Sequence, residues 1–181
     1  MAKLISKTYA QALFELAVEE NAASRILEEV TALLETIRGN DDFGKFMAHP
    51  KIPKEDKLQV VKNIFEGRLS KELIGFLVTI IEKDRYGEIE NILLEVIADI
   101  KEYNNIGTAC VTTAIELEDK EKDDIEKRLL ATTRYETIEC SYEVDKSLIG
   151  GMVIQMGDKV VDSSIRTKLG KLERELLAIQ L

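Results

Sequence analysis

The amino-acid sequence predicts a mainly α-helical protein, with an N-terminal six-helix bundle over residues 1–105 and a small α+β domain over residues 106–181. Two observations lead to this fold class. Apolar residues recur at helical spacing through the first part, where only short connections separate the helical segments. Beyond Asn104 and Asn105 the pattern changes to short β-branched or alternating runs, which are typical of strands. The second part is expected in the order β-α-β-β-β-α.

The helices of the first part are bounded by residues that commonly begin or end helices. Gly39 and Gly67 follow periodic apolar segments, as glycine often does at a helix C-terminus. Pro53 suits a first helical turn, and the Ser70 hydroxyl can cap the helix that follows it. One helix is expected to end before Pro50, since the residue before a proline disfavours helical geometry. The six expected helices are Leu4–Glu20, Ser24–Arg38, Asp41–Ala48, Pro53–Glu66, Ser70–Asp84 and Gly87–Tyr103.

The second part alternates between strand and helix patterns. Gly157 and Asp158 separate two short apolar runs and predict a two-residue hairpin in which the glycine takes a positive φ. Ser163 or Ser164 is expected to cap the last helix. The expected elements are the strand Thr108–Ala114, the helix Glu116–Thr132, the strands Thr137–Val144, Met152–Met156 and Lys159–Asp162, and a final helix with the apolar stripe Ile165, Leu169, Leu172, Leu176 and Ile179.

Composition argues against two classes of function. The 181 residues carry a net charge of −9, of which −5 falls before and −4 after residue 105, so neither part has the basic surface that binds nucleic acid. The longest strongly apolar stretch, Leu73–Ile81, is nine residues long, whereas a membrane-spanning helix needs about 20. No signal or transit segment is recognisable, so we expect a soluble chain without direct membrane insertion. Cys110 and Cys140 are interpreted as buried free thiols.

Gly150 and Gly151 raise the question of a phosphate-binding loop, but their spacing fits neither nucleotide-binding pattern. A P-loop has four residues between its glycines and then a lysine, whereas five residues separate Gly151 from Gly157, and Asp158 follows. A dinucleotide-binding glycine motif opens a helix, whereas this pair leads into a predicted strand. The glycines are therefore interpreted as a bend or a close backbone approach at the entrance to that strand.

Other catalytic patterns fail in the same way. His49 is the single histidine, and no serine or cysteine stands at the spacing of a nucleophile, so it is interpreted as a solvated or capping residue. The acidic run Glu116–Asp124 is interleaved with lysines and lacks the glycine of a calcium loop, which favours a solvated helix face. The sequence therefore predicts no catalytic, cofactor-binding or metal-binding residue, and a protein that is not an enzyme.

The first and fifth predicted helices carry more apolar residues than one buried face needs. One explanation is that the fifth helix is central and buried all round. The other is that the surplus residues border a groove for a partner helix, where Gly75 allows close approach. The sequence leaves both open. The stripes comprise Ile5, Tyr9, Leu13 and Leu16 beside Ala10, Phe14 and Ala17 in the first helix, and Leu73, Phe76, Leu77 and Ile80 beside Ile74, Val78 and Ile81 in the fifth.

Four segments resemble a known family. "KTYAQALFELA" (7–17), "FGKFMAHPKIPKEDK" (43–57) and "FLVTIIEKDRYGEIENI" (76–92) are similar to the N-terminal domain of the F-type ATP synthase delta subunit, the homologue of the oligomycin-sensitivity-conferring protein. "SLIGGMVIQMGDKVVDSSIRTKL" (147–169) resembles the C-terminal motif of that family. Lys146 stands where a proline is frequent, which bears only on local rigidity. The order and spacing of the motifs agree along nearly the whole chain.

The resemblance implies a non-catalytic stator subunit of the peripheral stalk, present in one copy on the cytoplasmic side of a bacterial cell membrane. It would link the catalytic head to the b-subunit stalk, so that rotor torque is converted into ATP synthesis. The family binds the N-terminal helix of an alpha subunit between its first and fifth helices, and the C-terminal region of the b subunit through its C-terminal domain. The candidate residues for binding the alpha-subunit helix are Tyr9, Leu13, Phe14, Ile74, Val78 and Ile81. Gly150, Gly151, Asp162 and Ser164 match the C-terminal motif and are assigned structural roles, and the last helix is the candidate for the b contact.

Two other classes of function stay open on the residues alone. A generic helical adaptor would bind a different amphipathic helix, and partner selectivity would distinguish it. An enzyme with an unrecognised site would show a saturable effect of a nucleotide or a metal on its melting temperature. The lack of a recognisable transit segment favours a bacterial over an organellar form.

Overall fold

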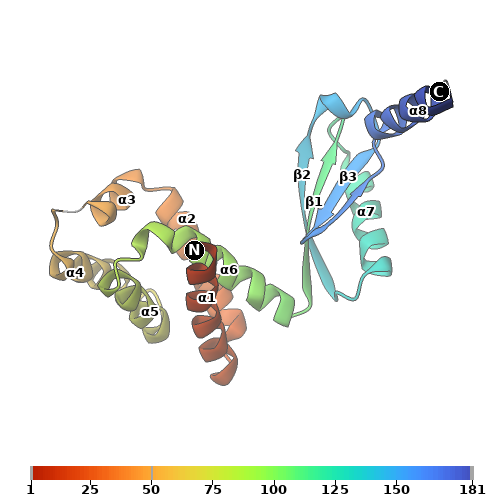
Figure 1. Cartoon of the computed structure of the whole chain (residues 1–181). Coiled ribbons are helices and arrows are strands. Elements are labelled where there is room, and N and C mark those ends of the chain that lie inside the picture. Colours follow the sequence, from red (N-terminus) through yellow and green to blue (C-terminus); the bar gives the residue numbers. More distant parts are fainter. Residues whose placement is uncertain (1, 50, 180–181) are drawn as a thin grey trace. The chain divides into compact units, whose positions relative to one another are not determined.

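The computed structural model describes residues 2–49 and 51–179, with the side chains of residues 6–49 and 51–177. The chain divides into two compact units, one ending at Tyr103 and the other beginning at Asn104. In the described residues the first unit contains six α-helices, and the second contains a four-stranded sheet and two α-helices (Figure 1). The predicted fold class is confirmed.

The helices of the first unit begin and end close to the expected positions. The Ser70 hydroxyl caps its helix by accepting a hydrogen bond from Leu73 N at 3.4 Å. Pro53 stands at the N-cap and not in the first turn, and Pro50 lies outside the described residues. The last helix begins later than expected because a 3-10 turn precedes it. The elements are α1 Ala2–Glu19, α2 Ala23–Arg38, α3 Asp41–Ala48, α4 Lys54–Phe65, α5 Lys71–Glu82, η1 Tyr86–Glu88 and α6 Ile89–Tyr103.

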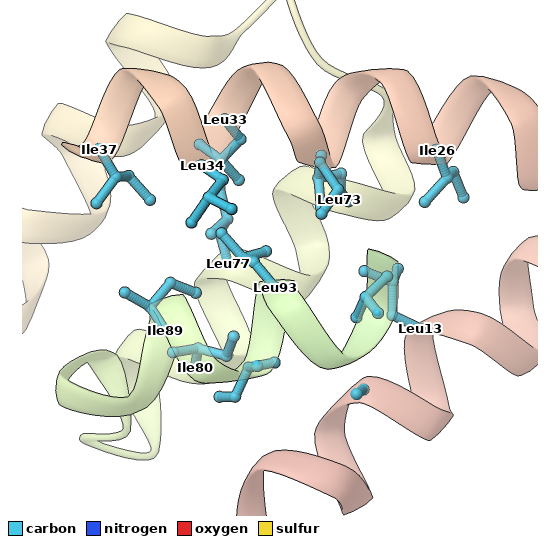
Figure 2. Packing of buried hydrophobic residues seen from close by; sticks show 14 of the residues in the cluster. Leu13, Ile26, Leu33, Leu34, Ile37, Leu73, Leu77, Ile80, Ile89 and Leu93 are labelled. Atoms are coloured by element: carbon cyan, nitrogen blue, oxygen red, sulfur yellow. The ribbon is translucent and has the colours of Figure 1, made fainter. Parts of the chain in front are cut away.

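One hydrophobic core holds these helices together. Its buried apolar residues lie between positions 10 and 100 and come from every α-helix of the unit. Figure 2 shows Leu34 of α2, Leu77 of α5 and Leu93 of α6 pointing toward one another. The aromatic ring of Phe43 adds edge-on contacts with Phe65 and Tyr86, at centroid distances of 6.1 and 6.3 Å. The core leaves α1 packed mainly on α6, with only a light contact to α5.

The second unit has the predicted order β-α-β-β-β-α. Its sheet runs β2-β1-β3-β4, in which α7 connects the parallel pair β1 and β2 and the other two pairs are antiparallel. In the hairpin, Met156 pairs with Lys159 around Gly157, whose φ is +55° as expected. The elements are β1 Ile106–Thr113, α7 Asp119–Thr132, β2 Thr137–Val144, η2 Lys146–Leu148, β3 Met152–Met156, β4 Lys159–Asp162 and α8 Ile165–Ile179.

Two details of this unit differ from the sequence prediction. Helix α7 begins at Asp119 and not at Glu116, because Glu118 and Glu121 form a capping box that satisfies its first backbone N–H groups. Cys110 and Cys140 are free thiols but only half-buried. They lie within β1 and β2, and burial raises the pKa of the Cys140 thiol.

Candidate partner-binding surfaces

A hollow of about 460 Å³ lies between α1 and α5 in the first unit, and we call it the α1–α5 hollow. Apolar and small side chains form most of its wall, with a charged residue pair at one end. Because α1 packs mainly on α6, the light contact with α5 leaves this space open. The lining residues are Tyr9, Ala12, Leu13, Leu16, Lys71, Glu72, Gly75, Phe76 and Thr79.

Two small residues, one from each helix, line the α1–α5 hollow, and we call this part its floor. Ala12 on α1 and Gly75 on α5 are both exposed. A Cβ atom added at Gly75 would meet no other atom within 4 Å, so the open space begins directly at the backbone. Leu16 and Phe76 are half-buried beside them and offer apolar contact surface. The exposure of Gly75 shows that α5 is not buried all round, which corrects the first of the two explanations given for its composition.

The charged end of the α1–α5 hollow is held in place by ion pairing. Arg25 of α2 donates to Glu72 at 3.4 Å and also lies 3.8 Å from Glu29. Glu29 in turn accepts hydrogen bonds from the backbone N and the hydroxyl of Ser70. A hydrogen bond with its own backbone N–H, assisted by Arg25, holds the pKa of Glu72 below its usual value. This carboxylate therefore stays ionised at neutral pH.

Six residues were predicted to contact the N-terminal helix of the alpha subunit, and two of them line the α1–α5 hollow. Tyr9 is half-buried at its wall. Leu13 also lines the hollow, but its side chain is only 2% exposed and belongs to the hydrophobic core. A partner in the hollow would therefore touch Tyr9 directly and Leu13 only at its edge.

Phe14 faces another neighbour. Its ring packs edge-on against Tyr103 of α6, with centroids 5.8 Å apart, and it borders a second hollow between α1 and α6. That hollow is acidic, and burial together with the neighbouring Glu95 raises the pKa of Asp99. Phe14 and the α1–α5 hollow thus lie on different flanks of α1.

The remaining three candidates on α5 also lie away from the α1–α5 hollow. Ile81 is 3% exposed and is a core residue. Ile74 and Val78 are half-buried, and helix geometry places them on roughly the opposite flank from Phe76. The other lining residues were not among the predicted contacts, although Leu16 and Phe76 belonged to the predicted stripes. The side chain of Ile5, another stripe residue, lies outside the described residues. The lining residues absent from the predicted set are Ala12, Leu16, Lys71, Glu72, Gly75, Phe76 and Thr79.

In the second unit, the four residues of the C-terminal motif meet at the base of α8. Gly150 accepts a hydrogen bond from Ile165 N at 2.9 Å, and a Cβ atom there would lie 2.7 Å from Ile165 Cδ1. Gly151 has a φ of +75° and packs against the backbone of Ser163. Both glycines are therefore required by close approach.

Asp162 and Ser164 complete this anchor by capping α8. Ser164 Oγ accepts a hydrogen bond from Thr167 N at 3.2 Å, which makes Ser164 the cap of the two candidate serines. Asp162 accepts from Thr167 Oγ1 at 2.6 Å and from Ser164 N at 2.9 Å. These hydrogen bonds, with Thr167 contributing most, hold the pKa of Asp162 below its usual value. The base of α8 is thus fixed by short polar contacts.

Beyond this anchor, α8 presents an apolar stripe to the surroundings. Its principal contact is with η2 at its base, and Figure 1 shows the helix projecting past the end of the sheet. The stripe residues Ile165, Leu169, Leu172 and Leu176 are between 41% and 66% exposed, and the side chain of Ile179, the fifth predicted member, lies outside the described residues. An exposed apolar row of this length marks a candidate interaction surface.

Comparison with known proteins identifies the group to which these surfaces belong. The family model described as ATP synthase delta (OSCP) subunit matches residues 5–176. An ATP synthase subunit delta of Lachnoclostridium phytofermentans is 49% identical over 181 residues, covering 100% of both chains. Another, of Acetivibrio thermocellus, is 32% identical over 175 residues, covering 97% of this chain and 98% of its own. The chain belongs to the ATP synthase delta (OSCP) subunit family.

A solved structure shows the same fold. A chain in the Toxoplasma gondii mitochondrial ATP synthase hexamer superimposes with a TM-score of 0.80 over 95% of this chain and 97% of its own, at 17% sequence identity. At this identity the likeness concerns the fold alone. As a delta-family member, the chain is a peripheral-stalk subunit of the multi-subunit ATP synthase, whose catalytic activity sits in other subunits. The family and the function predicted from the sequence motifs are confirmed.

Two observations on the described residues complete the picture of this delta-family chain. They contain no group of three or more His, Cys, Asp or Glu side chains placed to hold a metal ion. None of the helices in the described part of the chain combines the length and the apolar character that a membrane crossing requires. His49, singled out in the sequence, accepts a hydrogen bond at Nδ1 from Lys51 N at 3.2 Å, which is a local turn contact.

Proposed function

We propose that this delta-family subunit is a non-catalytic connector with two separate docking surfaces. The α1–α5 hollow receives the N-terminal helix of an alpha subunit, and α8 contacts the C-terminal region of the b subunit. One copy serves each complex, on the cytoplasmic side of the bacterial cell membrane. The chain itself carries no catalytic residue and needs no cofactor.

The observation that carries the alpha contact is the α1–α5 hollow itself. An amphipathic helix lying in a groove needs apolar walls and small residues that let the two backbones approach. Leu16 and Phe76 supply apolar walls, while Ala12 and Gly75 leave the floor open. Covering such a surface excludes water at about 25 cal/mol per Å² of apolar area, before the costs of association are subtracted. Lys71 and Glu72 at the end of the hollow offer polar contacts that fix the position of the bound helix along the groove.

The mechanical role follows from holding two partners at once. The rotor exerts torque on the catalytic head, and the head would turn with it unless a static element held it. A connector that binds the head through one unit and the stalk through the other supplies that restraint. Its two surfaces need affinity and stiffness, and neither needs a reactive group.

The test of the alpha contact is a calorimetric titration of the full chain with a peptide from the N-terminus of the alpha subunit of the same organism. We expect saturable one-to-one binding by the unmodified chain. Gly75→Leu should weaken binding at least 10-fold, since the new side chain fills the floor of the α1–α5 hollow. Gly44→Leu is the matched control, because Gly44 also lies in a helix with open space around its missing side chain. Equal affinities of the two variants would contradict the assignment.

A second pair of variants decides which flank of α1 binds. Leu16→Asp places a charge in the α1–α5 hollow, whereas Phe14→Asp places it on the α6 side of the same helix. We expect Leu16→Asp to weaken peptide binding at least 10-fold and Phe14→Asp to change it less than 3-fold, once both are shown to melt cooperatively. An unrelated amphipathic helix that bound equally well would instead support a generic helical adaptor.

A further inference from the structure

Most of α8 has little packing that could fix the direction of the helix. Residues 168–177 are exposed apart from the half-buried Gly170, and the principal contact of α8 is with η2 at its base. A helix that was joined to its domain by the backbone alone would swing about that joint. The direction of α8 is therefore set at its first turn.

Three consecutive residues of this first turn are each hydrogen-bonded to a different segment, and we call these attachments the α8 mount. The side chains of Arg166 and Thr167 leave the helix about 100° apart, whereas the N–H of Ile165 points along the axis. The turn is thus held from three directions, which fixes where the helix points. The attachments are Ile165 N to Gly150 O at 2.9 Å, Arg166 Nη1 to Ser147 Oγ at 3.1 Å, and Thr167 Oγ1 to Asp162 Oδ2 at 2.6 Å.

The Arg166 attachment belongs to a longer chain of hydrogen bonds. Ser147 donates to the Asp145 carboxylate twice, from its backbone N at 2.8 Å and from its hydroxyl at 2.9 Å. These hydrogen bonds, assisted by Arg166, hold the pKa of Asp145 below its usual value. Asp145 N in turn donates to Thr113 O at 2.8 Å. Arg166 is thereby connected to the last residue of β1, a central strand of the sheet.

The turn between Ser147 and Gly150 is strained in a way that the α8 mount explains. Ile149 has a φ of +66° and a ψ of −36°, near the rare γ-turn region that disfavours a residue with a Cβ. Its side chain is 65% exposed, so burial does not compensate for the strain. Such a residue persists only where the surrounding structure over-determines its conformation. Here α8 holds the chain on both sides of Ile149, Ser147 through Arg166 and Gly150 through Ile165.

The Arg166 attachment adds little to the stability of the chain. Asp145, Ser147 and Arg166 are all exposed. Hydrogen bonds and charge interactions in contact with water contribute little to the free energy of unfolding. The attachment therefore acts on the position of the helix more than on the stability of the fold.

We propose that the α8 mount holds α8 as a rigid arm of fixed direction, and that Arg166 is the residue that positions it. Because no neighbouring element has to pack along the helix, its apolar stripe stays free. This inference goes beyond the proposed function, since it concerns the direction of α8 and stands whichever partner the helix meets.

The test measures residual dipolar couplings of backbone amides in the full chain by NMR. In the unmodified chain, the couplings of residues 168–177 and those of the four strands should fit one alignment tensor. Arg166→Met should reduce the α8 couplings at least 2-fold relative to those of the strands and leave the melting temperature unchanged. Arg174→Met is the matched control on the same helix, because Arg174 donates within α8, to Gly170 O at 3.0 Å. It should leave the couplings unchanged.

Ser147→Ala tests the same attachment from the other side. This variant removes the acceptor of Arg166, so it should reduce the α8 couplings as much as Arg166→Met does. Combining the two substitutions should add nothing further, because both remove one hydrogen bond. Additive effects would show that the two side chains act separately and would overturn the assignment.

Three other results would also overturn the proposal. If the α8 couplings are already weak in the unmodified chain, the mount does not fix the direction of the helix. If Arg166→Met leaves the couplings unchanged, Arg166 does not position α8. If Arg166→Met abolishes the helical chemical shifts of α8, the residue holds the helix together and not its direction.

Discussion

A Cβ atom on Gly151 would lie 2.6 Å from the carbonyl oxygen of Ser163, closer than two such atoms approach in real structures. The φ of +75° at Gly151 is itself unfavourable for any other residue. Two independent constraints therefore act on this glycine. Gly151 precedes β3 and Ser163 precedes the cap of α8, so this contact places the start of β3 directly against the start of α8.

Gly151→Ala is expected to destabilise the chain by about 2–4 kcal/mol, because backbone strain adds to the steric conflict with Ser163. Gly157→Ala is the matched control, since Gly157 also has a positive φ but has open space around it. Gly157→Ala should lower the free energy of unfolding by only about 1 kcal/mol. Urea unfolding followed by circular dichroism measures both, and equal losses would show that the contact with Ser163 does not matter.

Asp162 should make the stability of the chain depend on pH in the acidic range. Its pKa is held below the usual value by hydrogen bonds from Thr167 and Ser164, so its stabilising effect is complete above about pH 4, the ordinary carboxyl pKa. The effect fades as the pH falls through the lowered pKa of the folded state. Asp162→Asn should therefore be less stable than the unmodified chain at pH 7, and the gap in urea midpoint should narrow at pH 3. A gap that stays constant with pH would rule out this linkage.

Tyr86 offers a substitution that should not destabilise. Among the described residues its buried hydroxyl has no hydrogen-bond partner, and burial, assisted by Glu90, raises the pKa of Tyr86 to about 12. Tyr86→Phe keeps the ring contact with Phe43 and removes an unsatisfied polar group, so it should leave stability unchanged or raise it by about 1 kcal/mol.

The advantage of Tyr86→Phe should grow above about pH 10, where unfolded tyrosine ionises while the folded hydroxyl stays protonated. Thermal melts at pH 7 and pH 10.5 test both parts. A loss above about 1 kcal/mol at pH 7 would mean that the hydroxyl has a stabilising partner.

Residues 1–105 are expected to fold without the rest of the chain. The buried apolar cluster of the first unit lies wholly between positions 10 and 100, so the fragment retains every member of its core. We expect helical circular dichroism and a single cooperative thermal transition. A gradual, non-cooperative melt would contradict the independence of this unit.

Local signals made most of the fold predictable. Ser70, the Gly157 turn and the serine cap of α8 are short-range features whose chemistry does not depend on the rest of the structure. The start of α7 was misplaced because a glutamate at the N-cap is an uncommon signal, although it forms a capping box with Glu121. The strain at Ile149 has no sequence pattern at all, since nothing in residue type announces a positive φ for isoleucine.

The candidate site could be predicted only to the level of the helices involved. Leu16 and Phe14 are large apolar residues on one helix, and both are half-buried. What separates them is the neighbour on each flank, the α1–α5 hollow for Leu16 and Tyr103 for Phe14. Periodicity gives the angle of a residue around its own helix, but the element that packs against that angle is a tertiary property. For the same reason Ile81 was chosen as a contact although it lies in the core.

The connection between the two units consists of Asn104 and Asn105, the only residues between the end of α6 and the start of β1. A backbone segment of two residues can extend by no more than about 7 Å before a helix or strand must unravel. Under load, a link of this length can lengthen very little. While α6 and β1 stay intact, the two chain ends that the link joins therefore cannot move far apart.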